Sequence, residues 1–332
     1  MSLMNRYAAW LPDNPVMRAE LAHLLQGQAR EPGWRRGIRR LALTVGLGMA
    51  VGLFTAALLA AILQIELTDR FRQPDIRLMV IPFVIFTLLV HFGLMLSTLS
   101  LAANSIAREK QAQTWDMLVL TSMDARQIVR GKWAAVIRRQ LPAYLALSAL
   151  RIGAMVWFTL DFWSFSFGPF PQSPAIFPPL LNFFFFVLFI TSMTLANLAF
   201  TAACGIWASA VTSRPALAMV RAIINRLALL LIPAIIIYFA INRVEVSSFF
   251  SGRFFGMMFN ISFNLLDNGA TESTSLIFVR HSFAEESSQI VIELGWLLAS
   301  ALAALGIYAL WTGVALWRAQ TLAVKHLETP PE

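Results

Sequence analysis

A series of long apolar segments constrains this chain more than any other feature of its sequence. A helix needs about 20 consecutive apolar residues to cross the hydrocarbon core of a bilayer. The fifth such segment is short, and it contains Pro233, which can kink a helix. The sequence predicts an all-α, polytopic membrane protein with six transmembrane spans, at 41–63, 78–103, 141–160, 180–211, 227–241 and 290–317.

The composition agrees with lipid as the main solvent. Of the 332 residues, 58% are hydrophobic and 13% are charged, whereas soluble domains carry roughly 25% charged residues. We expect residues 1–332 to form a single transmembrane domain, because no stretch has the composition of a soluble domain. The single cysteine, Cys204, lies in an apolar run and is expected to be a small packing residue.

The Lys and Arg residues are distributed unevenly between the two sides of the predicted spans. The N-terminal segment, the loops after spans two and four, and the C-terminal segment carry 19 of them, whereas the alternate loops carry six. Under the positive-inside rule both termini are cytosolic, and the large loop at 242–289 is external. The net charge of +8 is explained by this asymmetry, because the basic residues lie beside membrane lipids. Nucleic acid is therefore not expected as a partner.

Residues 15–26 are predicted to form an amphipathic helix ahead of the first span. Asn14 is a suitable N-cap, and Pro15 suits the first helical position. Apolar residues recur at helical spacing at Met17, Leu21, Leu24 and Leu25. Such a helix is expected to lie flat in the interface of the cytosolic leaflet; the alternative is a solvated leader.

The loop at 107–132 contains a short apolar helix that is too short to span a membrane. It shows Trp115, Met117 and Leu118 in a cytosolic segment that is otherwise rich in charge. Asp124 and Gln127 have the spacing of a capping box for the next helix. An exposed apolar patch of this kind marks a docking surface for another protein; the alternative is an interfacial segment that contacts only lipid headgroups.

This segment resembles the signature of the ABC-2 type transporter permeases. The charged start of that signature matches Arg108, Glu109 and Lys110. Its short helix matches Thr114, Trp115, Asp116, Met117 and Leu118. Its turn and exit match Thr121, Asp124, Gln127, Gly131 and Lys132. The run from Asn14 to Leu21, with Glu20 inside it, also resembles the start of many such permeases. Two positions depart from the pattern: Gln113 replaces the usual Gly, and Gln111 stands where a second Glu is common.

The resemblance implies a membrane-spanning permease subunit of an ATP-driven ABC transporter, expected to be an exporter of the bacterial inner (plasma) membrane. The segment at 107–132 would be the coupling segment, seated in a groove of a cytosolic ATP-binding subunit. The residues expected to bind that partner are Glu109, Thr114, Trp115, Asp116, Met117 and Leu118. A second permease subunit, identical or related, would complete the membrane part.

Catalysis is not expected in this chain itself. It has no Gly-x-x-x-x-Gly-Lys-Ser/Thr loop, so ATP and Mg would bind in the partner subunit. The histidines have no metal-ligand spacing, so no metal is expected either. A different class of function also fits the same loop, namely a non-transporting membrane scaffold or assembly factor that anchors a peripheral cytosolic protein.

Two polar features lie inside the predicted spans. Arg151 is near the middle of span three, where an arginine costs about 2.5–3.5 kcal/mol on insertion scales. It is therefore expected to face protein or a water-filled pathway, either to meet an anionic substrate group or to make a structural pair. A polar stripe on span four either lines a cavity or bonds neighbouring helices; it comprises Asn182, Ser192, Asn197 and Thr201.

Overall fold

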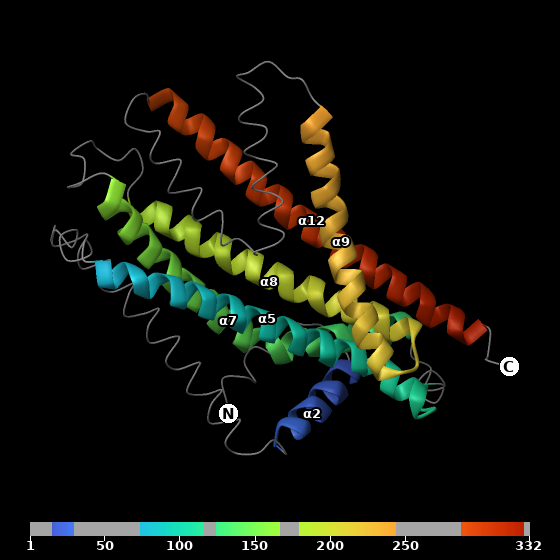
Figure 1. Cartoon of the computed structure of the whole chain (residues 1–332). Helices are drawn as coiled ribbons and strands as arrows, with labels where there is room; N and C mark the ends of the chain where they lie inside the picture. The colour runs from blue at the N-terminus through green and yellow to red at the C-terminus, as the bar shows by residue number, and fades with distance from the viewer. Residues whose placement is uncertain (1–14, 30–73, 116–123, 167–178, 244–286, 329–332) are drawn as a thin grey trace.

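The computed structural model describes residues 15–29, 74–115, 124–166, 179–243 and 287–328 (Figure 1). Over these residues the chain is all-helical, as the apolar segments predicted, and it forms six helices. Their bounds are α2 (Pro15–Ala29), α5 (Pro74–Gln111), α7 (Ala125–Ser166), α8 (Pro179–Val211), α9 (Pro215–Arg243) and α12 (Ser287–Glu328).

Proline marks the start of several helices. Its fixed φ suits the first helical turn, and the N–H that it lacks would have no intrahelical partner there. Helices that begin in this way start at Pro15, Pro74, Pro179 and Pro215. Inside a helix a proline removes one backbone hydrogen bond, yet α7 continues through Pro142 and α9 continues through position 233.

Helix α8 is the centre of the described part of the molecule. It packs against α5, α7, α9 and α12, and α2 lies against α7. Figure 1 shows α5, α7 and α8 side by side, with α9 running in a different direction across them. The helices on which most of the sequence signals lie, α5 and α7, are therefore both fastened to one central helix.

Small residues allow α5 and α8 to approach closely. A side-chain methyl at Gly205 would collide with Ala102 and with the α5 backbone, so only glycine fits there. The residues of α8 that precede Gly205, namely Ala202, Ala203 and Cys204, are also small and fully buried. The prediction that Cys204 is a small packing residue is confirmed.

Three of the described helices contain a segment long and apolar enough to cross a membrane: Phe86–Gln111, Val187–Val211 and Leu302–Val324. They coincide with the expected second, fourth and sixth spans. The expected third and fifth spans fall within α7 and α9, and the first, at 41–63, lies outside the described residues, as does most of the loop at 242–289. The six-span topology therefore stays a prediction.

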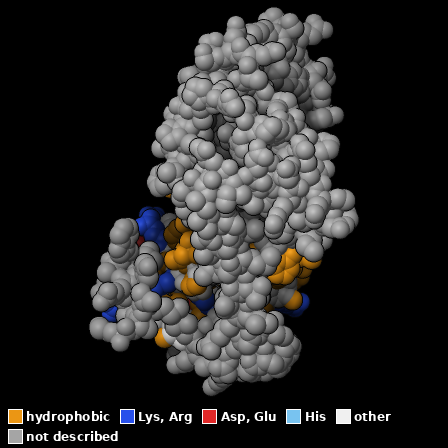
Figure 2. Space-filling view, turned by 90° about the vertical axis from the view of Figure 1, so that its left-hand side faces the viewer, with side chains coloured by type: hydrophobic (Ala, Val, Ile, Leu, Met, Phe, Trp, Pro, Cys, Tyr) orange, Lys and Arg blue, Asp and Glu red, His pale blue; other side chains and the backbone are white. Residues whose placement is uncertain are grey.

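Large hydrophobic side chains cover the outer faces of these helices. Exposed examples are Phe86, Leu88, Leu89 and Phe92 on α5, and Leu302, Leu310 and Trp317 on α12. A soluble monomer rarely leaves an extended apolar surface open to water. Lipid contact accounts for these faces, and Figure 2 shows such side chains next to Lys and Arg on one face.

Helix α2 is present where a helix was predicted, but its apolar side faces protein. Met17, Leu21 and Leu24 pack in a cluster with Leu101 of α5 and with alanines of α7. The apolar stripe of α2 thus packs against protein in this structure, and the position of α2 at the membrane interface stays a prediction. Its apolar stripe finds a protein surface, and burial against a fixed neighbour removes the same area from water.

Candidate functional site

The expected coupling segment leaves α5 through a tight helix end. The N–H of Thr114 donates to the carbonyl of Glu109 at 2.9 Å, and the N–H of Gln113 donates to that of Lys110 at 3.2 Å. These two bonds, with Gln113 at a φ of 57°, form a Schellman motif. A left-handed residue at this position favours glycine, so the usual Gly of the resembled signature suits the conformation that Gln113 adopts.

The segment returns to the bundle at the N-cap of α7. The Asp124 carboxylate accepts a hydrogen bond from the N–H of Arg126 at 3.1 Å, and its carbonyl accepts from Gln127 and Ile128. Asp124 is therefore the N-cap, as the sequence predicted. The expected site residues Asp116, Met117 and Leu118 fall at 116–123, outside the described residues.

Trp115, one of the expected partner-binding residues, is buried within the described bundle. Its side chain is 1% exposed and packs in a cluster with Val16 of α2, Ile106 of α5 and Ile128 of α7. In this arrangement the ring is covered by the chain's own helices, and the expected role of Trp115 in partner binding stays a prediction. The ring anchors the first residues of the segment to the bundle, because its large apolar area is removed from water within the chain.

Exposed residues at the two ends of the segment form the surface that remains open to a partner. Thr114 is exposed, and its hydroxyl donates to the carbonyl of Glu109 at 3.3 Å. The other exposed residues that the structure describes in the segment are Arg108, Gln111, Ala112, Gln113, Asp124, Arg126, Gln127 and Arg130. Among the expected partner-binding residues that the structure describes, Thr114 is exposed to solvent.

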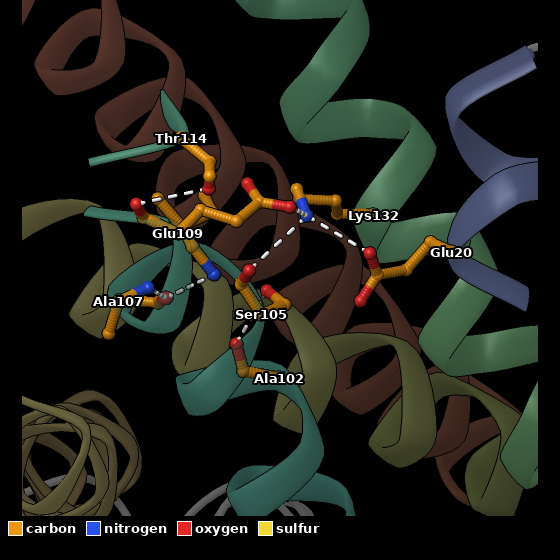
Figure 3. A network of polar contacts seen from close by, with 9 residues as sticks. Glu20, Ala102, Ser105, Ala107, Glu109, Thr114 and Lys132 are labelled. Carbon is orange, nitrogen blue, oxygen red and sulfur yellow. Dashed lines mark hydrogen bonds and ion pairs between the residues drawn. The ribbon is translucent and has the colours of Figure 1, made fainter. Parts of the chain in front are cut away.

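A buried ion network lies directly beneath this surface (Figure 3). The Lys132 ammonium, 1% exposed, lies 3.1 Å from Oε2 of Glu20 and 2.6 Å from Oε1 of Glu109. It also donates to the carbonyl of Ser105 at 3.2 Å. An ammonium has three N–H donors, and each of them has an acceptor here. The network joins α2, α5 and α7 at one point.

The network brings together three separate pieces of the resembled signature. Glu20 comes from the N-terminal run, Glu109 from the charged start, and Lys132 from the exit of the segment. In the sequence, Glu20 lies off the apolar stripe of its helix and Lys132 lies in a predicted loop, so the burial of these two side chains was not expected. One signal could have revealed this burial: both residues belong to the segments that resemble the permeases. A charged side chain that lies among apolar residues needs a partner of opposite charge or a hydrogen-bonding group.

Helix α8 holds the same end of α5 from the other side. The Ser209 hydroxyl accepts from the backbone N–H groups of Ile106 and Ala107, at 2.9 and 2.8 Å. The Lys110 ammonium donates to the carbonyl of Ala210. The last turn of α5 is thus attached both to α8 and to the ion network, so a displacement of the segment would be transmitted to the central helix.

A second polar cluster lies deeper in the bundle. Arg226 of α9 is 7% exposed and donates to Oδ1 of Asn197 at 2.8 Å and to the hydroxyl of Thr201 at 3.2 Å. Nδ2 of Asn197 lies 3.4 Å from Nε2 of His91. Two members of the polar stripe on span four therefore bond a neighbouring helix. Arg226, counted as a loop charge from sequence, is in fact buried.

Arg151 is 4% exposed on α7, which confirms that this arginine avoids lipid. Among the described residues there is no group of three His, Cys, Asp or Glu side chains that could hold a metal ion. The first of the two polar clusters contains ion pairs and hydrogen bonds, and the second contains hydrogen bonds. No protein-family model, curated protein or solved structure matches this chain.

Proposed function

We propose that this chain is the membrane-spanning permease subunit of an ATP-driven ABC transporter, acting as an exporter. The observation that carries the proposal is the convergence of Glu20, Glu109 and Lys132 at the base of the coupling segment. These residues are far apart in sequence, and each belongs to a piece of the signature that the chain resembles. A network that joins them supports a shared role in holding the segment.

The proposed mechanism begins at a cytosolic ATP-binding subunit. ATP and Mg bind there, closure of two such subunits moves the segment at 107–132, and the movement reaches the bundle through the last turn of α5. The ion network keeps that turn, α2 and α7 together as one unit, while Ser209 links it to α8. A second permease subunit supplies the other half of the pathway, and both termini face the cytosol of a bacterial inner membrane.

Arg151 and Arg226 are the candidates for a role in the pathway. Both are buried in helices of the bundle, where a positive charge attracts anionic groups.

The first test is purification of the full-length subunit in mild detergent and identification of the cytosolic proteins that accompany it. We expect an ATPase that carries a Gly-x-x-x-x-Gly-Lys-Ser/Thr loop, in fixed stoichiometry. Co-purification of a peripheral protein without ATPase activity would instead favour the membrane scaffold or assembly factor.

The second test uses the open surface at the end of α5. Ala112→Arg adds a long side chain to an exposed turn, where a positive charge suits a helix C-terminus. We expect it to reduce the co-purified ATPase severalfold without loss of folded subunit. The matched control is Ala19→Arg, at an exposed position of α2. Full retention of a coupled ATPase by Ala112→Arg would argue against docking at this surface.

A further inference from the structure

A small pocket lies between α2, α5 and α7, beside the ion network. Its volume is about 200 Å3, which is below the roughly 300–1,000 Å3 typical of sites that enclose a whole small molecule. The pocket is therefore suited to a single compact group whose remaining atoms stay outside. None of the functions considered above uses it.

Two cationic side chains lie in the walls of the pocket. They are Arg108 of α5 and Arg139 of α7, and most of the other lining residues are neutral. The one carboxylate in the walls belongs to Glu20, which already pairs with Lys132. A compact anion is the complementary occupant, and guanidinium groups bind phosphate oxygens with paired hydrogen bonds.

The pocket also has an apolar side at a defined depth. Leu24 and Leu101 line it together with the basic groups. Leu101 and Arg108 lie near the end of the candidate membrane span Phe86–Gln111, and seven residues of helix separate them by about 10 Å along the axis. The apolar side of the pocket therefore lies toward the middle of the candidate span, and its basic side lies toward the end of the span.

We propose that this pocket binds the phosphate group of an anionic phospholipid. The guanidinium groups of Arg108 and Arg139 hold the phosphate, and the acyl chains continue past the two leucines into the bilayer. Basic pockets between membrane helices recognise lipid headgroups in this way. The bound lipid fastens α2 to α5 and α7, next to Glu20 and Lys132. The proposal requires the membrane span but does not depend on transport.

The test measures lipid binding to the purified full-length subunit. Thermal unfolding in a neutral detergent is followed while phosphatidylglycerol is added, because a ligand that binds only the folded state raises the melting temperature. We expect phosphatidylglycerol to raise it in a saturable manner and phosphatidylcholine to leave it unchanged. Equal effects of the two lipids would overturn the proposal, and so would an equal shift with inorganic phosphate, which would indicate a site for free anions.

Variants locate the binding. Arg108→Gln combined with Arg139→Gln should weaken phosphatidylglycerol binding about thirtyfold, at roughly a kilocalorie per basic residue. The matched control, Arg126→Gln with Arg130→Gln, removes the same charge at exposed positions of α7 outside the pocket. Wild-type affinity in the first pair, or an equal loss in the control pair, would show that the pocket is not the site. If the first pair does not fold, the lipid comparison on the unaltered subunit still decides.

Discussion

Two buried cations in this molecule are stabilised in different ways. Lys132, at the base of the coupling segment, is surrounded by two carboxylates and a carbonyl. Arg226, deeper in the bundle, is held by the amide oxygen of Asn197 and the hydroxyl of Thr201. The first site contains one more acid than base, whereas the second pairs a cation with neutral oxygens.

The difference shows what each environment permits. Near the helix ends, acids on α2 and α5 can reach a buried lysine, and the ion pairs fix three helices in one arrangement. Inside the bundle an acid would itself have a high free-energy cost of burial. Neutral hydroxyl and amide groups bond the arginine instead, and they do not neutralise its charge. The first site fixes structure, and the second keeps a positive potential in the bundle.

The largest effect is expected from Lys132→Met. Removing one member of a buried ion pair leaves its partners uncompensated and typically costs about 3–5 kcal/mol. The subunit should lose most of its resistance to unfolding in mixed SDS micelles. A control that replaces all three charges, Glu20→Gln with Glu109→Gln and Lys132→Met, should recover part of the loss. If the triple variant were less stable than the single one, the pairing would not be the cause.

A smaller effect is expected from Arg226→Met. The partners left behind are neutral, so the cost is that of unsatisfied polar groups, about 1–3 kcal/mol. Arg221→Met, at an exposed position of the same helix, is the control and should change little. A loss for Arg226→Met as large as that for Lys132→Met, in the same SDS titration, would remove the distinction between the two sites.

The C-terminal end of the coupling segment can be destabilised by a substitution that leaves both buried cations unchanged. Asp124→Ala removes the N-cap of α7 and should cost about 1 kcal/mol. We expect a modest decrease in melting temperature, and Asp124→Asn should retain most of the stability because an amide oxygen also caps. Equal losses in the two variants would show that charge rather than capping matters at this position.

The smallest effect is expected at the other end of the segment. Gln113 adopts a φ of 57°, which costs a non-glycine residue about 1–2 kcal/mol, whereas glycine has a higher entropic cost of folding. Relief of the first cost exceeds the second, so we expect Gln113→Gly to stabilise the folded state by about 0.5 kcal/mol. Gln113→Val should instead destabilise, because a β-branched residue disfavours this conformation. A destabilised glycine variant in the same thermal assay would contradict the helix-end geometry.

The sequence determined a large part of the local structure by itself. Pro15 marked a helix start, Asp124 was recognised as an N-cap, and apolar runs indicated the helices that contain the candidate membrane spans. The burial of Arg151 was also predictable, because the cost of placing an arginine in lipid is large whatever its partners are. Each of these inferences depends on residues close together in the chain or on the solvent around one helix.

Only the tertiary structure decided which charges meet and which apolar faces are covered. Glu20 and Lys132 are 112 residues apart, and Glu109 and Lys132 are 23 apart. Helical periodicity states which side of a helix is apolar, but it does not state which neighbour covers it. For that reason the sequence assigned α2 to the lipid interface and Trp115 to a partner subunit. The apolar side of α2 and the ring of Trp115 are buried within the chain, because packing against neighbouring helices removes their apolar area from water.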